Sequence, residues 1–345
     1  MVERRKVQRT GSSSYIVTLP KEWIDSIGVR PGDYVLIYEH GNKLIITPIY
    51  TESQQLTSEV KISSPDVGIE EIFRVVVAQY LAGYSTISLT FKENIPGLAR
   101  KISELKNLAR VKLAGIEVVD ETYNTLVLKI LLNLEELPLM RAIRRLHLIV
   151  NNMLNDAIRA FRDGNKGLAE AVIQRDDEAD RFHFMITRQL ALALLDIRIM
   201  HSLGITSPVE TINYRILARN LERIADHAVN IARRALQRPE KCKYCNNISD
   251  LGEKAIELFT KSMDSIYRLS RRTAEETIRE SAILVNKLQE LLSNKILRDT
   301  EITDLEKTTL SMVYDSLRRI IRYSSGIAEA TLNIKVSRNN VVEIK

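Results

Sequence analysis

The feature that most constrains the fold is a long run of helical periodicity in the C-terminal part of the chain, from residue 135 to residue 335. Glycine and proline are scarce in the whole chain, with 13 and 8 occurrences, so few residues would interrupt helices. The clearest segment is 208–237, where apolar residues recur every three or four positions and would share one helix face. These residues are Leu217, Leu221, Ile224, Ala228, Ile231 and Ala235. The pattern predicts an all-α region in which each helix buries one stripe.

We expect six helices in this region. They are predicted near 137–162, 166–200, 208–237, 249–271, 274–296 and 301–334. A weak internal repeat relates the third helix to the sixth, because Leu221-Glu222-Arg223-Ile224 lines up with Leu317-Arg318-Arg319-Ile320. Such a repeat indicates two copies of a three-helix bundle, which we place at 135–238 and 246–335.

The N-terminal segment 3–50 has the pattern of short β-strands. Small polar and apolar residues alternate, and glycine and serine clusters mark turns. The predicted elements are strands within 7–19 that are broken by a turn at 11–14, a helix at 21–27, and a hairpin of strands 34–38 and 43–48 around a turn at 40–42. We therefore predict a first, β-rich domain over residues 1–52.

A second, smaller domain is predicted over residues 68–133, after a polar linker at 50–67. Its order is α-β-α-β-β, with helices at 70–81 and 98–109 and strands at 86–92, 115–119 and 125–132. This small α/β domain contains no phosphate-binding glycine motif and no paired nucleophile and base, so its sequence assigns it no role.

Charge and hydropathy limit the partners and the location of the protein. The formal net charge is +6 and the pI is about 9.1, which favours an anionic partner. The tightest basic cluster is Arg4, Arg5, Lys6 and Arg9; the alternative is an ordinary solvated end of the chain. No signal peptide is recognisable, and no apolar run approaches the roughly 18–20 residues that span a bilayer. We expect a cytoplasmic protein without membrane insertion.

Two acidic pairs are the main candidates for binding chemistry. Asp176 and Asp180 lie four residues apart on the second predicted helix, and Glu222 and Asp226 do so on the third. This spacing puts each pair on one helix face, so neighbouring helices would bring four carboxylates together and favour a cation. The alternative is an ion-paired helix surface, because arginines flank both pairs. They are Arg175, Arg181, Arg219 and Arg223.

The two cysteines form one Cys-x-x-Cys motif, Cys242 and Cys245, in the loop between the two helical halves. Zinc prefers four ligands, so two thiolates would need a second copy of the chain. A redox role would need the motif at a strand-to-helix turn, which the loop context does not provide. We therefore expect two reduced loop cysteines.

The sequence also lacks Walker A, HExxH, GxSxG and di-iron Glu-x-x-His motifs, so we predict no enzymatic activity.

Residues 3–48 resemble a SpoVT/AbrB-type swapped-hairpin domain. The matching motifs are Arg5-Lys6-Val7-Gln8-Arg9-Thr10-Gly11, Val17-Thr18-Leu19-Pro20-Lys21-Glu22-Trp23, Gly28-Val29-Arg30-Pro31-Gly32-Asp33-Tyr34-Val35 and Leu44-Ile45-Ile46-Thr47-Pro48. The resemblance implies an obligate homodimer with interleaved hairpins that presents basic residues to DNA. By position, it implies phosphate and groove contacts from Arg4, Arg5, Lys6 and Arg9, and backbone contacts from Ser12 and Ser13.

Residues 135–335 resemble the PhoU family, which consists of two three-helix repeats. The resemblance rests on Leu221-Glu222-Arg223-Ile224-Ala225-Asp226-His227-Ala228-Val229-Asn230-Ile231-Ala232 and on Arg175-Asp176-Asp177-Glu178-Ala179-Asp180-Arg181. The family uses carboxylate motifs of this kind to hold metal clusters. The resemblance therefore implies a divalent or ferric ion, typically iron or zinc, at Asp176, Asp180, Glu222 and Asp226.

The second repeat departs from this family pattern. Arg318 and Arg322 replace Glu222 and Asp226, and Ser281 and Val285 stand in the places of Asp176 and Asp180. We predict that the second metal cluster is lost. Arginine suits planar anion recognition, so Arg318 and Arg322 are candidates for binding an anion such as phosphate. The alternative is pairing with neighbouring carboxylates, for which the candidates are Glu306, Asp315 and Glu329.

The two resemblances together imply a DNA-binding transcriptional regulator of phosphate uptake and phosphate homeostasis, with a metal-binding helical sensor. An alternative is a PhoU-like accessory protein that does not bind DNA and that contacts a phosphate transporter or its signalling kinase. A third possibility is an antitoxin, because the swapped-hairpin fold also neutralises toxins. The long helical region argues against it, since antitoxins of this fold are usually short.

Overall fold

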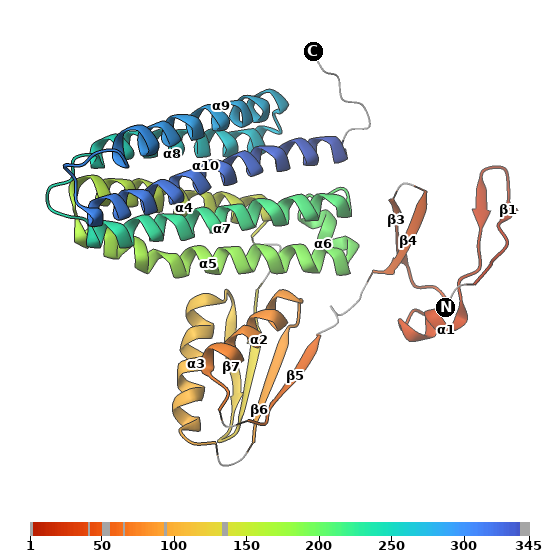
Figure 1. Ribbon diagram of the computed structural model, residues 1–345. Helices are drawn as coiled ribbons and strands as arrows, with labels where there is room; N and C mark the ends of the chain where they lie inside the picture. The colour runs from red at the N-terminus through yellow and green to blue at the C-terminus, as the bar shows by residue number, and fades with distance from the viewer. Residues whose placement is uncertain are drawn as a thin grey trace. The chain divides into compact units, whose positions relative to one another are not determined.

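The computed structural model describes residues 3–40, 42–49, 56–64, 66–92, 95–132 and 137–338. The chain divides into two compact units, Met1–Gln55 and Leu56–Lys345. Figure 1 shows small β-hairpins in the first unit, and an α/β sheet and a layered helical region in the second. The predicted multi-domain architecture is confirmed.

The first unit consists of two hairpins and a short helix. Strands β1 (Gln8–Thr10) and β2 (Ser14–Ile16) pair antiparallel, and Gly11 turns the chain between them with a φ of 64° that suits glycine. Helix α1 (Lys21–Ser26) follows Pro20, and strands β3 (Val35–His40) and β4 (Lys43–Pro48) form the second hairpin. The elements match the prediction; Gly41, in the predicted turn, lies outside the described residues.

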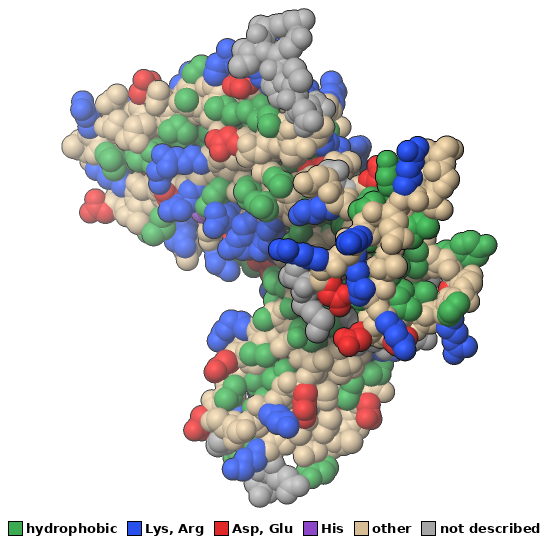
Figure 2. Space-filling view, turned by 90° about the vertical axis from the view of Figure 1, so that its right-hand side faces the viewer, with side chains coloured by type: hydrophobic (Ala, Val, Ile, Leu, Met, Phe, Trp, Pro, Cys, Tyr) green, Lys and Arg blue, Asp and Glu red, His purple; other side chains and the backbone are tan. Residues whose placement is uncertain are grey.

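This unit buries almost none of its hydrophobic side chains. Among its described residues, no Val, Ile, Leu, Tyr or Trp side chain is buried. The most exposed are Tyr34 at 79%, Tyr15 at 71%, Val7 at 69% and Leu44 at 64%. Figure 2 shows exposed hydrophobic side chains next to Lys and Arg side chains at the molecular surface. A single copy of this unit therefore has no core of its own.

The second unit begins with the α/β domain. Its elements are β5 (Thr57–Ile62), α2 (Ile69–Leu81), β6 (Thr86–Phe91), α3 (Leu98–Lys112), β7 (Ile116–Glu121) and β8 (Thr125–Ile130). The sheet has the order β5-β6-β8-β7, with β5 and β6 parallel and the other neighbours antiparallel. Fully buried Tyr80, Ile87, Leu89 and Leu126 form part of its core.

Strand β5 corrects the linker prediction, because residues 57–62 were assigned to the linker. The strand lies at the sheet edge and turns Ser58 and Ile62 inward, while Thr57, Glu59 and Lys61 are exposed. Its inward face is thus only partly apolar, and its composition is that of a polar linker.

The helical region follows. It comprises α4 (Leu139–Asp163), α5 (Lys166–Leu195), α6 (Ile197–Ser202), α7 (Pro208–Gln237), α8 (Cys245–Arg268), α9 (Arg271–Glu290), the π-helical turn η1 (Leu291–Ile296) and α10 (Asp304–Arg338). The six predicted helices are present, with two differences. The helix predicted over 166–200 breaks at Asp196, which is extended and caps α6 through Arg198 N–H. The one predicted over 274–296 ends in η1.

The helices pack as two related triplets. Helices α4, α5 and α7 pack together, α8, α9 and α10 do the same, and α7–α10 and α4–α8 contacts join the triplets. Figure 1 shows these long helices lying side by side. Each of the six predicted stripe residues of α7, from Leu217 to Ala235, is at most 1% exposed, so that prediction is confirmed. No helix within the described ranges is both long and apolar enough to cross a bilayer.

The α/β domain is fastened to the helical region through α2 and α3, which pack on α5. Arg188 of α5 is 4% exposed and donates from Nη1 to the carbonyl of Tyr80 at 2.6 Å and from Nη2 to that of Gly83 at 3.2 Å. A buried guanidinium thus satisfies carbonyls at the end of α2.

Candidate functional site

The predicted DNA-contact residues lie at the start of the first unit. Arg4, Arg5 and Lys6 precede β1, and Arg9 lies within it; all four are exposed. Arg9 Nη2 donates to the Ser12 carbonyl at 2.6 Å, which ties the strand to the turn. Arg5 forms an ion pair with Glu3, so a phosphate would compete with that carboxylate for Arg5. The structure therefore leaves the basic strand accessible to an anion.

The turn between β1 and β2 contains the other two predicted contacts. Ser12 and Ser13 are exposed and lie next to Gly11. Because Arg9 pairs with Tyr15 in the β1–β2 register, the turn and the basic strand form one short hairpin. The residues that sequence analysis selected here are close in space, and their contact with DNA stays a prediction.

The predicted carboxylate centre lies between α5 and α7. Asp176 and Asp180 come from α5, and Glu222 and Asp226 from α7, which packs against it. Partial burial raises the pKa of Asp176 to about 6, and the nearby charges of Asp180 and Asp226 raise it as well. Burial, with Asp226 as the next contribution, raises the pKa of Glu222 to about 7. The charges of Asp180 and Asp226 thus act on carboxyl groups of both helices, and the four-carboxylate centre stays a prediction.

Two cations already contact these carboxylates. Lys112 Nζ, from the end of α3, lies 2.9 Å from Asp180 Oδ2 and 3.0 Å from Asp177 Oδ1. Arg219 Nη1 donates to Glu222 Oε1 at 2.5 Å, whereas Glu222 Oε2 is buried and has no hydrogen-bond partner. Sequence analysis missed Lys112, because it belongs to a distant domain and no local pattern marks it.

The structure does not bring these side chains together as a metal site. Within the described ranges, no three His, Cys, Asp or Glu side chains are grouped closely enough to hold a metal ion. The nearby histidines are engaged elsewhere: the His183 ring Nδ1 lies 3.1 Å from the Ala218 carbonyl, and His227 packs on Tyr323. The donor set fits a cation in its chemistry, through acidic oxygens that repel one another and an unpartnered Glu222 oxygen.

The equivalent place in the second repeat is basic. Arg318 Nη2 contacts Asp315 Oδ1 at 2.7 Å, so Asp315 is the carboxylate that pairs with it. Arg322 is exposed and forms no ion pair among the described residues. Ser281 donates to the Ile278 carbonyl at 2.7 Å within α9. The acidic cluster of the first repeat has no counterpart here, and anion binding stays a prediction.

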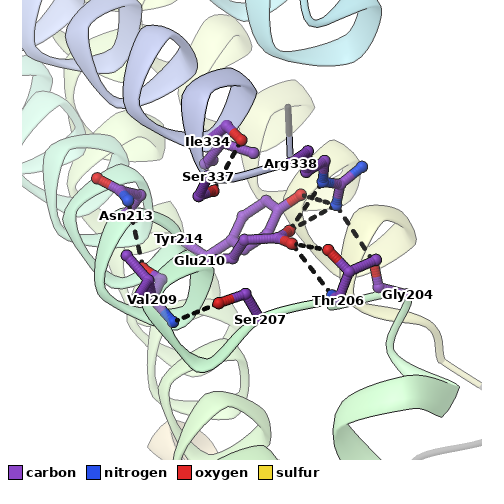
Figure 3. Close-up of polar contacts among 10 residues, drawn as sticks. All are labelled: Gly204, Thr206, Ser207, Val209, Glu210, Asn213, Tyr214, Ile334, Ser337 and Arg338. Atoms are coloured by element: carbon purple, nitrogen blue, oxygen red, sulfur yellow. Dashed lines mark hydrogen bonds and ion pairs between the residues drawn. The ribbon is translucent and has the colours of Figure 1, made fainter. Parts of the chain in front are cut away.

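A buried carboxylate that sequence analysis missed is Glu210, at the start of α7. It is fully buried, and Arg338 at the end of α10 donates to its Oε2 from Nε at 2.9 Å and from Nη2 at 2.7 Å. Its Oε1 accepts from the backbone N–H of Thr206 at 3.1 Å and from the Thr206 hydroxyl. Figure 3 shows Arg338 and Thr206 converging on this carboxylate, with Tyr214 beside it. The signal would have been a lone Glu after a Pro within the first helical turn.

The cysteines correct the prediction of two reduced thiols. Cys242 and Cys245 form a disulfide, and no free cysteine remains in the described part of the chain. Cys245 is the first residue of α8, so the motif lies at a loop-to-helix junction.

Comparisons with known proteins agree with this architecture. Residues 143–235 match the family described as PhoU domain. The helical region contains a PhoU domain. Residues 8–53 match the family described as antidote-toxin recognition MazE, bacterial antitoxin. Both resemblances inferred from the sequence are therefore confirmed.

Two solved structures are similar to part of this chain. PhoU from Pseudomonas aeruginosa is 19% identical over 57% of this chain and 94% of that one, with a TM-score of 0.50. The phosphate transport system regulatory protein PhoU from Streptococcus pneumoniae is 18% identical over 58% and 94%, with a TM-score of 0.45. Identity this low shows the fold alone. No curated protein matches the chain.

Proposed function

We propose that this protein is a DNA-binding transcriptional regulator of phosphate uptake and phosphate homeostasis. The first unit would bind DNA as a homodimer, and the PhoU-like region would sense a phosphate-linked signal and change DNA affinity. The match to PhoU supports the link to phosphate, and the match to a swapped-hairpin family supports DNA binding. This function requires a cytoplasmic location, where the DNA is. No enzymatic step is part of the proposal.

The observation that carries the proposal is the surface of the first unit, which is both apolar and basic. Exposed residues such as Tyr34, Ile37 and Leu44 would gain a core if two copies interleaved their hairpins. Dimerisation would also pair exposed strand edges, which otherwise invite aggregation. The dimer would carry two copies of the basic strand that contains Arg4, Arg5, Lys6 and Arg9, and would thus present a two-fold surface to duplex DNA.

The experiment is a gel-shift titration with the full chain and duplex DNA from its own promoter, across salt concentrations. If about four to six of the duplicated charges touch phosphates, affinity falls on the order of a hundredfold to a thousandfold between 50 and 200 mM salt. A double variant Arg5→Ala/Arg9→Ala should bind weakly and with a shallower salt dependence. Arg30→Ala/Lys43→Ala removes the same charge from other exposed positions of this unit and is the matched control.

The possible outcomes separate the competing functions. Equal binding by the Arg5/Arg9 double variant and the control would exclude the basic strand as the DNA contact. No binding to any duplex at low salt would favour the accessory protein, which a pull-down of a transporter subunit or its kinase would then identify. Tight binding of a small toxin by the isolated chain, without DNA binding, would favour an antitoxin.

We further propose a cation site in the first repeat and an anion site in the second. Asp176, Asp180, Glu222 and Asp226 would hold a divalent or ferric ion, with iron or zinc expected. The ion would neutralise carboxylates that now repel one another and would give Glu222 Oε2 a partner. Such a site would link α5 to α7, and it would respond to any change that moves these helices apart.

The proposed anion site consists of Arg318 and Arg322. Arg322 has no ion pair among the described residues, and the Arg318 Nε is buried without a hydrogen-bond partner, which supports a missing acceptor. Calorimetric titration with inorganic phosphate tests it: Arg318→Ala/Arg322→Ala should abolish a binding signal that Arg272→Ala, an exposed arginine on α9, retains.

A further inference from the structure

The Cys242–Cys245 disulfide occupies a particular place in the helical region. The pair lies after α7 and starts α8, so it stands at the junction of the two triplets. Cys245 is 2% exposed, whereas Cys242 is only partly buried. Cys242 is therefore the more exposed residue of the pair.

The two residues that the disulfide encloses hold the start of the last helix. The backbone N–H of Lys243 donates to Glu306 Oε1 of α10 at 2.7 Å. Lys243 Nζ lies 2.8 Å from Asp299, and the Tyr244 hydroxyl donates to the same carboxylate at 2.6 Å. Glu306 is 6% exposed, so loss of the Lys243 N–H would leave a buried carboxylate oxygen without this hydrogen-bond donor, which is costly. The conformation of this short loop therefore affects the start of α10.

A disulfide that closes such a short loop contributes little to the stability of the fold. It closes a loop with only two intervening residues, so it removes little entropy from the unfolded chain compared with a long-range disulfide. Two features favour exchange instead. A thiolate at a helix N-terminus is stabilised by the helix dipole, and Cys-x-x-Cys motifs are the usual sites of thiol–disulfide exchange.

We propose that Cys242 and Cys245 form a reversible redox site that exchanges with a dithiol reductant and controls the contact between the inter-triplet loop and α10. The thiolate of the reductant attacks Cys242 Sγ, forms a mixed disulfide, and releases Cys245 as a thiolate at the start of α8. The second thiol of the reductant then attacks its own sulfur in the mixed disulfide and releases Cys242. Two electrons and two protons pass to the protein, and the reductant leaves as a disulfide.

The redox state changes how firmly Lys243 is held. In the disulfide form, the ring through Cys242 and Cys245 fixes the two residues between them. In the dithiol form, the backbone of this loop regains freedom, and the Lys243–Glu306 bond opens more often. Glu306 then lacks its partner at the start of α10, which packs on α7 of the first triplet. Reduction would thus loosen the joint between the two repeats.

The test uses the folded full-length protein, titrated with reduced and oxidised dithiothreitol and then alkylated for mass measurement. A reversible two-electron transition between alkylated and unalkylated forms is expected without unfolding. Hydrogen exchange at the Lys243 amide should accelerate about tenfold in the reduced form, because the amide loses its acceptor more often. The variant Cys242→Ser/Cys245→Ser should match the reduced protein and should not respond to dithiothreitol.

Single variants test which sulfur is attacked. With oxidised glutathione, Cys245→Ser, which retains Cys242, should form a mixed disulfide at least about tenfold faster than Cys242→Ser, because burial shields Cys245. The proposal is overturned if the disulfide resists dithiothreitol until guanidinium unfolds the chain, or if purified reduced protein does not reoxidise. Unchanged Lys243 exchange on reduction would overturn the link to α10.

Discussion

Glu210 on α7 and Glu306 on α10 occupy the same position in the two helical repeats, at the offset that also relates Leu221 to Leu317. Each carboxylate is buried in the first turn of its helix. Glu210 is held from the end of α10, and Glu306 is held from the loop between α7 and α8. Arg338 at the end of α10 binds Glu210, and the backbone N–H of Lys243, in the α7–α8 loop, donates to Glu306. The antiparallel pair α7–α10 is thus fastened at both ends.

The Glu210 contact is expected to stabilise the fold. Arg338→Ala leaves a fully buried carboxylate with only Thr206 as its partner, and should lower the free energy of unfolding by about 2–4 kcal/mol. Arg322→Ala on the same helix is the matched control and should change it by less than about 0.5 kcal/mol. Chemical denaturation measures both. If Glu210→Gln restores part of the lost stability in the Arg338→Ala background, the loss comes from the unpaired charge of Glu210. Equal stability of Arg338→Ala and Arg322→Ala would show that the Arg338–Glu210 ion pair does not stabilise the fold.

Dimerisation through the first unit makes a separate prediction. Leu44 on β4 is 64% exposed, and we expect it to lie in the dimer core. Leu44→Asp should therefore convert a dimer into a monomer at micromolar concentration by light scattering, because a buried, unpaired carboxylate is costly. Leu297→Asp, at a 51% exposed position of the helical region, should leave the dimer intact. A wild-type protein that is monomeric with its hairpins folded would contradict the interleaved arrangement.

The proposed cation site predicts one variant with less bound metal and one with more. Glu222→Ala/Asp226→Ala should abolish metal content by elemental analysis, whereas Lys112→Met should increase uptake, because the Lys112 ammonium competes for Asp180. Asp250→Ala/Glu253→Ala removes an acidic pair of α8 that contacts Arg162 of α4, and it is the control. Equal metal in the Glu222/Asp226 variant and the wild type would place the site elsewhere. No metal in any of them would leave an ion-paired helix surface.

Periodicity predicted the helical region well, because packing buries one stripe per helix and leaves a repeating pattern in the sequence. Leu217 and Ala235 are therefore recognisable from spacing alone, and so is the antiparallel hairpin of β3 and β4. Strand β5 was missed because an edge strand needs few apolar residues. The break at Asp196 was missed because a capping aspartate inside an apolar run resembles any polar helix residue.

The site was predictable only where its parts share one helix. The pairs Asp176/Asp180 and Glu222/Asp226 follow from a spacing of four, and α5 packs against α7. Lys112 and Arg338 contact carboxylates that are far away in sequence, so only the tertiary fold reveals them. The disulfide was missed because two cysteines separated by two residues pair only if the backbone turns between them, and the sequence does not fix that turn.

Acid should weaken the joint between α4 and α8 through His147. Its ring packs edge-on against Phe259 of α8 at 5.2 Å, its Nδ1 lies 2.9 Å from the Tyr267 hydroxyl, and its Nε2 is buried without a hydrogen-bond partner. Burial lowers the pKa of His147 to about 4; Asp264 opposes this shift, and Arg144 adds to it.

In the unfolded chain His147 has an ordinary pKa near 6.5. Between about pH 6.5 and pH 4 it is therefore protonated in the unfolded chain and neutral in the folded protein. His147 does not affect the free energy of unfolding above about pH 6.5. As the pH falls from 6.5 toward 4, its burial lowers that free energy by about 1–3 kcal/mol. His147→Gln should flatten this part of the unfolding free energy measured against pH, whereas His201→Gln, at an exposed position on α6, should not. Burial also lowers the pKa of His183 and of His227, so some loss of stability in acid should remain in the His147 variant. A His147→Gln profile that runs parallel to the wild type between pH 4 and pH 7 would mean that this imidazole is protonated in the folded protein.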